Sequence, residues 1–491
     1  MASVKGKVYQ RNSQLLIHRD KASGGVTTLN AAVAAGVNSI DLVANPGTAF
    51  AIGKTIRVGD GNEMELNRIT GITGAGPFTA TLAYNTTHAH AAGDAVVEMV
   101  SYDFGDIEAA GFSVTVDGES QDVLVSTKRL PYTILDGYKD LGGSFALPNV
   151  SIDNFPLAFG MLGSVVSGAG TVADPKGFAT DGNQFAADPN VGITVIGVLM
   201  DGTVTYTELW GVDADYTGMS LALVRGQLAS IPVKVLAAAG GVTGTGAPGY
   251  TVDASLRPTK NKVLTAITEV GIFSASGTLS TTVATAAAAA GQKTVECAAV
   301  TGATPGDLVK IGTGDQAEWH EIDSVSAPNL VLRTPLFRTQ PVGTPVVEAG
   351  RVSFAGVSQE GVKLDVGGSV DKIRTAISAT SIGSRPGSAV MTLSFATIDI
   401  TLSQLAYALG ISQASIVANR LPMTGALVGR SPVDGAYLKG LCADGSTFEI
   451  RAWACAQSIT QFVLQLTNQG TIPQAPFTLR PTSGLQVLNY Q

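Results

Sequence analysis

The sequence predicts a mainly β protein built as two tandem copies of one unit. In each copy, a larger β-sandwich or barrel module packed by one helix carries an inserted small β-barrel domain. Three observations support this prediction. The chain repeats itself at a nearly constant spacing, short β-rich runs recur about every 8–12 residues, and Asp-Gly or Gly-Gly pairs follow alternating apolar runs.

The repeat can be read directly from the sequence. Residues 26–36 (VTTLNAAVAAG) align with residues 281–291 (TTVATAAAAAG), and residues 199–211 (LMDGTVTYTELWG) align with residues 442–454 (CADGSTFEIRAWA). The second alignment places Trp210 on Trp453 in a chain that has only three Trp. A tandem duplication predicts a symmetric assembly in which one chain fills two equivalent places.

The spacing between the two copies shrinks in small steps along the chain. It is 255 residues from Gly36 to Gly291 and 243 residues from Trp210 to Trp453. Changes of this size fit short insertions and deletions in the surface loops of two collinear copies. The alignment therefore indicates that the whole unit was duplicated, inserted domain included.

The repeat and the local composition predict the domain organisation. The larger module is assigned to residues 1–25 and 99–236 in the first copy and to 262–280 and 349–491 in the second, and the small domains to residues 26–98 and 281–348. Residues 237–261 are rich in Gly, Ala and Pro and are expected to form the linker.

Each small domain is predicted to be a small β-barrel or sandwich. In the first copy, Gly, Asn and Pro separate five β-rich runs: NSIDLVAN, KTIRVGD, EMELNRITGI, FTATLAY and DAVVEMV. The Ala-rich segment 28–36 that precedes them fits either a short helix or an entry strand. The sequence does not decide between the two.

Two-residue turns are predicted at four places in the larger modules. They are Asp117-Gly118, Asp201-Gly202, Gly367-Gly368 and Asp444-Gly445. The last strands of each copy are placed after the second of its two turns. In the first copy they include the segment that begins with MSLAL at Met219.

One helix is predicted in each larger module. In the second copy it opens at Thr401 with a capping box and closes at Gly410, with an apolar stripe of Leu402, Leu405 and Leu409. In the first copy the equivalent helix is expected to start at Asp153 and to carry Phe155, Phe159 and Leu162.

The composition is unusual for a soluble chain of 491 residues. Charged residues make up only 14% of the sequence, 58 residues are Gly, and the mean hydropathy is +0.25. A surface with so little solvating charge predicts extensive burial against other subunits. The alternative is a large, Ala-rich monomer.

The charge, the cysteines and the N-terminus exclude several classes of protein. A net charge of −8 provides no excess of positive charge with which to bind the phosphates of nucleic acid. Three cysteines, at positions 297, 442 and 455, do not make a disulfide framework and are interpreted as small core residues. The sequence shows no signal-peptide pattern and no bilayer-spanning apolar run, so we expect a chain made in the cytoplasm without a membrane segment.

No catalytic, cofactor-binding or metal-binding residue is predicted, and the chain is not expected to be an enzyme. It contains no phosphate-binding loop, nucleophile elbow or dinucleotide fingerprint. Asp213 and Asp215 are interpreted as turn residues.

Two other groups could bind a metal, but a simpler interpretation is favoured for each. His88 and His90 fit a loop tip better than a metal site, because residues 338–340 of the second copy contain no His. Asp60, Glu63 and Glu65 fit a solvated strand face better than a Ca²⁺ cluster, because the second copy does not keep Glu63.

The larger module resembles the major tail protein, or tail tube protein, of long-tailed, siphovirus-type bacteriophages. The resemblance covers both larger modules, about two-thirds of the chain. It rests on the Asp-Gly pair after GFSVTV, the helix ending LAFGMLG or LAYALG, the DGT segment leading to Trp210, and the late Ile-Pro strand. It is a match in the order of elements, without an invariant motif.

The resemblance implies a structural protein of the virion tail, assembled in the host cytoplasm. Members of the family stack as hexameric rings around a lumen through which DNA passes, and forms with two fused tube domains make trimeric, pseudo-hexameric rings. The resemblance also implies contacts with tape measure, tail terminator and tip proteins, and places the small domains outside the tube. The alternative is another repetitive structural protein, such as a capsid decoration protein, an adhesin or an S-layer-like subunit.

Overall fold

The protein is described from a computed structural model. It describes residues 11–22, 24–44, 50–74, 76–107, 112–123, 133–147, 150–158, 166–180, 190–199, 201–215, 219–223, 231–257, 264–283, 286–354, 357–367, 370–373, 383–386, 390–398, 401–424, 433–457 and 475–491.

The predicted mainly β fold is confirmed: the described residues form two large, mainly antiparallel sheets of 13 strands each. The first sheet contains β1 (Arg11–Asp20), β2 (Val26–Thr28), β3 (Ser39–Leu42), β4 (Thr55–Val58), β5 (Glu65–Thr73), β6 (Phe78–Leu82), β7 (Ala95–Asp106), β8 (Ser113–Val123), β9 (Thr133–Leu147), β11 (Gly192–Val198), β12 (Val204–Asp215), β14 (Ile231–Thr245) and β15 (Val252–Asp253).

The second sheet contains β10 (Lys176–Thr180), β13 (Met219–Leu223), β16 (Leu264–Thr282), β17 (Thr294–Glu296), β18 (Leu308–Ile311), β19 (Glu318–Ser326), β20 (Asn329–Leu332), β21 (Pro345–Phe354), β22 (Val357–Gly367), β25 (Val390–Thr397), β26 (Val433–Cys442), β27 (Thr447–Gln457) and β28 (Ala475–Tyr490). A separate pair of strands consists of β23 (Val370–Ile373) and β24 (Gly383–Pro386). The α-helices are α1 (Phe155–Ala158) and α2 (Leu402–Ala408).

The two sheets repeat one strand order. The first runs β3-β6-β5-β4-β7-β1-β11-β12-β14-β9-β8, and the second runs β17-β20-β19-β18-β21-β16-β26-β27-β28-β25-β22. Each strand of one series has its counterpart at the same place in the other. The repeat seen in the sequence is therefore also a repeat of the sheet topology.

Each small domain is a closed barrel. In the first copy, β2 pairs with β7 on one side, and on the other the amide of Val43 donates to the carbonyl of Thr28 at 3.0 Å, which joins β2 to the end of β3. In the second copy, the amide of Ala298 donates to the carbonyl of Thr282 at 2.9 Å and closes the ring in the same way. Of segment 28–36, which fitted a helix or a strand, only Thr28 belongs to a strand, β2; Leu29 and Val33 make isolated β-bridges, and the segment forms no helix.

Each barrel has a hydrophobic core of its own, separate from the core of the larger modules. The first barrel encloses a cluster that includes Phe50 and Ile69, and the second encloses one that includes Leu330 and Val346. Strands β7 and β21 run from the barrels into the larger sheets and carry the chain between the two cores.

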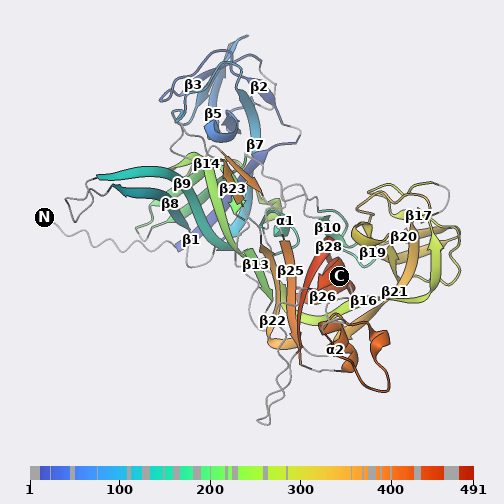
Figure 1. Ribbon diagram of the computed structural model, residues 1–491. Helices are drawn as coiled ribbons and strands as arrows, with labels where there is room; N and C mark the ends of the chain where they lie inside the picture. The colour runs from blue at the N-terminus through green and yellow to red at the C-terminus, as the bar shows by residue number, and fades with distance from the viewer. Residues whose placement is uncertain are drawn as a thin grey trace.

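The larger modules share one continuous core. Buried side chains of both copies, among them Phe145, Leu209, Phe395 and Ile450, belong to a single hydrophobic cluster. Figure 1 shows the two larger sheets meeting at the centre, with the blue barrel of the first copy at the top and the yellow-green barrel of the second at the right.

Two of the four predicted turns are confirmed. Asp201-Gly202 joins β11 to β12, and Asp444-Gly445 joins β26 to β27, with Gly202 and Gly445 in the left-handed region at φ of 86° and 82°. In both turns, the aspartate side chain accepts a hydrogen bond from the amide two residues later. This geometry explains why Asp-Gly is favoured there.

The other two predicted turns are not turns of the sheet. Strand β8 continues through Asp117 and Gly118, and its pairing with β9 is only shifted between Gly118 and Ser120. Strand β22 ends at Gly367 and pairs with β25 and β13 rather than with the next strand, β23; Gly368 lies outside the described residues. A shift of this kind is typical of a β-bulge, which a glycine pair also favours.

The helix of the second copy has the predicted cap. The Thr401 hydroxyl accepts from the amide of Gln404 at 3.2 Å, and the Gln404 side chain accepts from the amide of Thr401 at 2.8 Å. Leu405 and Leu409 are buried as expected, but Leu402 is 38% exposed and does not belong to the apolar stripe. In the first copy, α1 begins at Phe155 and not at Asp153, while Phe159 and Leu162 lie outside the described residues.

The linker starts later than the sequence suggested. Strand β14 continues to Thr245, so residues 237–245 belong to the first sheet. Beyond it, Tyr250 is buried and the short strand β15 pairs with β7. Although its Gly-rich composition predicted a free linker, this segment is held to the sheet because β14 pairs with β12 and β15 pairs with β7.

Candidate assembly surface

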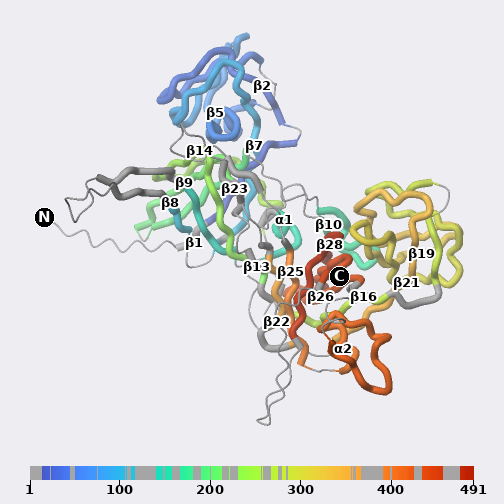
Figure 2. Tube along the Cα trace, viewed as in Figure 1, coloured from blue at the N-terminus to red at the C-terminus, as the bar shows by residue number. Residues whose placement is uncertain are grey.

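The first module donates two strands to the sheet of the second. Strand β13 pairs with β22 at one edge, and β10 pairs with the part of β28 beyond its contact with β25. Figure 2 shows both: green β13 beside β22, and blue-green β10 beside red β28. The contact between the modules is therefore made by main-chain pairing as well as by side-chain packing.

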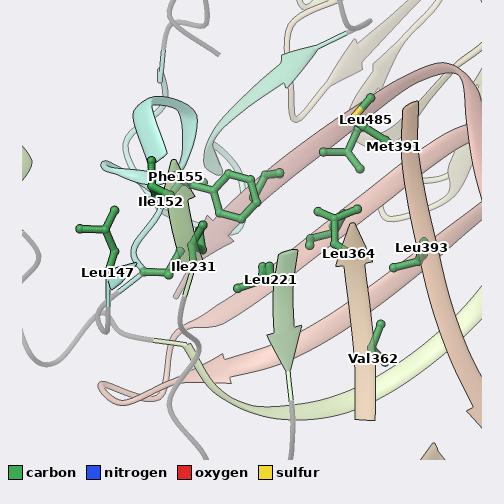
Figure 3. Packing of buried hydrophobic residues seen from close by; sticks show 14 of the residues in the cluster. Leu147, Ile152, Phe155, Leu221, Ile231, Val362, Leu364, Met391, Leu393 and Leu485 are labelled. Atoms are coloured by element: carbon green, nitrogen blue, oxygen red, sulfur yellow. The ribbon is translucent and has the colours of Figure 1, made fainter. Parts of the chain in front are cut away.

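Strand β13 carries a core residue across to the other module. Leu221 is opposite Leu364 of β22 in the antiparallel register, and both side chains are buried. Figure 3 shows Leu221 in one layer with Val362, Leu364 and Leu393. The edge of β22 is thus covered by a strand that completes the hydrophobic core.

Strand β10 and helix α1 form a second contact. Phe178 of β10 lies 5.6 Å from Phe155 of α1 between ring centroids, and Phe155 lies 6.5 Å from Phe448 on β27 of the second module. An ion pair of 2.5 Å between Lys176 and Asp153 ties β10 to the turn before α1. Helix α1 was expected behind the sheet of its own module, but its aromatic side chain reaches the other one.

The sequence did not reveal this exchange. The alternation around Met219 and Leu221 predicts a strand, and β13 is one, but the sequence placed it in the sheet of its own copy. Main-chain pairing to β22 carries no sequence signal. The one signal would have been structural: without β13, hydrophobic side chains at the edge of β22 would be exposed.

The two matched tryptophans lie where each barrel joins its larger sheet. Trp210 packs with Met64, Leu66 and Met99, and Trp453 packs in a cluster that includes Trp319 and Tyr437. The pairing register of β12 and β27 shifts immediately after each Trp. There Gly211 and Ala454 adopt φ of 60° and 43°, so the same bulge turns the indole towards the barrel in both copies.

The histidines and glutamates that were weighed as metal ligands are structural. Glu65 is buried, which contradicts the solvated face expected for it, whereas Glu63 is exposed. Glu65 accepts hydrogen bonds from the amide of Thr87 at 2.6 Å and from His90 Nε2 at 3.0 Å. His90 is buried rather than at an exposed loop tip, and the His88 ring instead bonds the carbonyl of Ala239.

The second copy repeats this arrangement. Glu318 accepts from the amides of Phe337 and Arg338, both at 2.8 Å, and Gln340 takes the place of His90 at 3.0 Å. A buried glutamate therefore holds the corresponding loop of each barrel. Asp213 and Asp215, interpreted as turn residues, lie instead within β12.

One pair of equivalent positions differs sharply between the copies. Glu208 on β12 corresponds to Arg451 on β27, and both side chains are buried. Glu208 accepts hydrogen bonds from the Tyr250 hydroxyl at 2.7 Å and from Trp210 Nε1 at 3.2 Å. Burial raises the pKa of Glu208 to about 7, although these two bonds partly oppose the shift.

We expect Glu208 to make the first module less stable as the pH rises. Its pKa is about 4.5 without burial and about 7 in the folded protein, so the folded state keeps a proton that the unfolded chain releases between these values. Stability should therefore fall by about 3 kcal/mol between pH 4.5 and 7, and stay level above that window. Glu208→Gln should remove this decline.

The measurement is hydrogen exchange of the β12 amides at pH 5 and pH 8, corrected for intrinsic rates. The wild type is compared with Glu208→Gln, because His18 is buried with a pKa lowered to about 3 and contributes the opposite trend equally to both proteins. The same pH dependence in the two proteins would contradict the assignment.

No cluster of three or more His, Cys, Asp or Glu arranged for a metal ion occurs among the described residues. All three cysteines are buried free thiols, as their interpretation as core residues predicts. In the part of the chain that the structure describes, no helix has the length and apolar character needed to cross a bilayer.

Comparison with known proteins does not place the chain in a family. A scan against protein-family models finds no match, and a search of curated proteins finds none either.

Proposed function

We propose that this chain is a structural protein of a bacteriophage tail, which polymerises as stacked trimeric, pseudo-hexameric rings to form the tail tube. The observation that carries the proposal is the repeated topology combined with strand exchange: two modules of one strand order lie side by side and pair through main-chain hydrogen bonds. Two neighbouring modules in a ring of similar modules would be paired in this way.

Edge pairing between modules suits a continuous β-lined channel. A ring in which each module covers the edge of the next leaves no free strand edge inside it, and closure of this kind protects against uncontrolled aggregation. The low charged fraction of 14% agrees with a chain that buries much of its surface in such an assembly.

The acidic charge balance suits passage of DNA through the lumen. A net charge of −8 makes a neutral or negative channel lining possible, and such a lining would repel phosphate and let the duplex slide. The two barrels, each with its own core, would decorate the outside. Contacts with tape measure, terminator and tip proteins belong to the same proposal.

Negative-stain electron microscopy of the purified chain tests this function. We expect hollow tubes of stacked rings, and a ring species with the mass of three 50.1 kDa chains. Lattices, knobs or solid fibres would point instead to another repetitive structural protein. A chain that stays monomeric at high concentration would overturn the proposal.

A further inference from the structure

Within the described residues, the first module has an uncovered sheet edge where the second module has a covered one. Among the described strands, β8 pairs only with β9, and its other edge has no strand partner. Val114 and Val116 on this strand are 45% and 65% exposed. Exposed valines on an unpaired edge strand favour pairing with another strand.

These valines lie on the core side of the sheet. They follow Phe112 at intervals of two residues, and Phe112 packs on the hydrophobic core beside Phe145, with ring centroids 6.2 Å apart. Val114 is opposite Gly143 in the register of β8 and β9. It is therefore exposed because no described strand lies beyond β8, and not because it faces away from the core.

The equivalent position in the second module shows how such an edge is covered. Leu364 takes the place of Val114, and it is opposite Leu393 of β25 as Val114 is opposite Gly143 of β9. Leu364 is only 1% exposed because β13, donated by the first module, lies beside it.

A second edge repeats the contrast. In β28, the residues from Leu485 to Asn489 are covered by β10 of the first module. The corresponding end of β14, residues 241–245, pairs with β12 on one side and has no described strand on the other. Val242 there is 37% exposed. Both edges left open on the first module are thus those that the first module covers on the second.

We propose that the edges of β8 and β14 bind a second copy of this chain, whose second module covers them as β13 and β10 cover β22 and β28. The loop that carries β13 joins β12 to β14, and its counterpart after β27 is residues 458–474, which lie outside the described residues. By sequence, Phe462, Leu464 and Leu466 repeat the spacing of Met219, Leu221 and Leu223. We assign residues 462–466 as the occupant of the β8 edge.

The contact is heterologous, because the second module of one chain meets the first module of the next. Such a contact makes a ring if its rotation closes and an open chain if it does not. The inference thus identifies the partner and the direction of the assembly proposed above. The same edge assignment applies if the chain forms another kind of polymer.

The test uses two variants of the full-length chain. Val114→Lys with Val116→Lys alters the β8 edge, and Leu464→Lys alters the occupant. Each alone should raise the concentration needed for self-association on the order of 100-fold, measured by analytical ultracentrifugation. Mixed together they should form a complex of two chains and nothing larger, because one variant keeps an intact donor and the other keeps an intact edge.

The control is Val43→Lys with Ile52→Lys, which also replaces two exposed hydrophobic side chains with lysine. Val43 is 56% exposed and Ile52 is 70% exposed, and both lie on the first barrel. The control variant should assemble like the wild type. Equal assembly of the β8 variant and the wild type, or the absence of a two-chain complex in the mixture, would overturn the inference.

The two proposals can fail separately. If the wild type forms tubes and the β8 variant forms them equally well, the edge assignment is overturned and the tail-tube function stands. A wild type that forms fibres or lattices, and loses them in the β8 variant, would overturn the function and leave the edge assignment standing. A monomeric wild type would overturn both.

Discussion

Replacing Arg451 with methionine is expected to destabilise the second module by about 3–5 kcal/mol. Arg451 is buried and lies between two carboxylates: its Nε is 2.8 Å from Glu449 Oε1, and its Nη2 is 3.1 Å from Glu321 Oε1. Glu449 is on β27 and Glu321 is on barrel strand β19. The substitution would leave both buried carboxylates short of positive charge.

The pKa of Glu449 shows how strongly this site depends on its arginines. Burial alone would raise the pKa, but the positive charges of Arg451 and Arg351 outweigh burial and lower it to about 2. Arg351 also bonds Glu449, at 3.1 Å, and contacts Glu321. It cannot neutralise both carboxylates alone.

The loss should be measured as the change in urea midpoint of the second module. Arg333→Met is the matched control, because Arg333 contacts Glu321 at the partly exposed rim and should cost about 1 kcal/mol or less. Combining Arg451→Met with Glu449→Leu should recover much of the stability, since an apolar pair leaves fewer unpaired charges. If Arg451→Met proved no worse than Arg333→Met, the buried network would not be a major source of stability.

Replacing Leu221 with aspartate should free β13 from the second module and cost about 3 kcal/mol or more. The Leu221 side chain is fully buried against the core beside Leu364, so a carboxylate there would lose its hydration without gaining a partner. We expect faster hydrogen exchange at the β22 amides that face β13, because their edge would open to solvent.

Val114→Asp is the control for this experiment. It introduces the same charge at the sheet position equivalent to Leu364, but in the first module, where the side chain is 45% exposed. In dilute, unassembled chains it should change stability by about 0.5 kcal/mol or less. Equal effects of the two substitutions would show that β13 contributes little to the core.

Local features of this fold were predictable where one short sequence determines the geometry. The Asp-Gly pairs at 201–202 and 444–445 make turns because the aspartate bonds the backbone two residues later. The helix cap at Thr401 depends only on Gln404, three residues on. The five β-rich runs of the first barrel are β3, β4, β5, β6 and β7.

Features set by distant contacts were not predictable. Asp117-Gly118 resembles a turn, but its neighbours in β9 keep it within a long strand. Glu65 resembles a surface residue, and it is buried because the amide of Thr87, 22 residues later, supplies a hydrogen bond. The alternation around Leu221 identifies a strand without saying which sheet will accept it. In each case a partner far along the chain decides the outcome.

The pairing of β10 with β28 has a consequence for how the chain is made. Lys176 pairs with Asn489, 313 residues later. During translation, the first module therefore emerges with a strand whose partner is synthesised 313 residues later. Until then the edge of β10 lacks the cover that β28 provides, and Phe178 has only its contact with Phe155; such nascent surfaces attract chaperones or neighbouring chains. A ribosome that stalls before β28 is made would hold a first module that is complete in sequence and unfinished in structure.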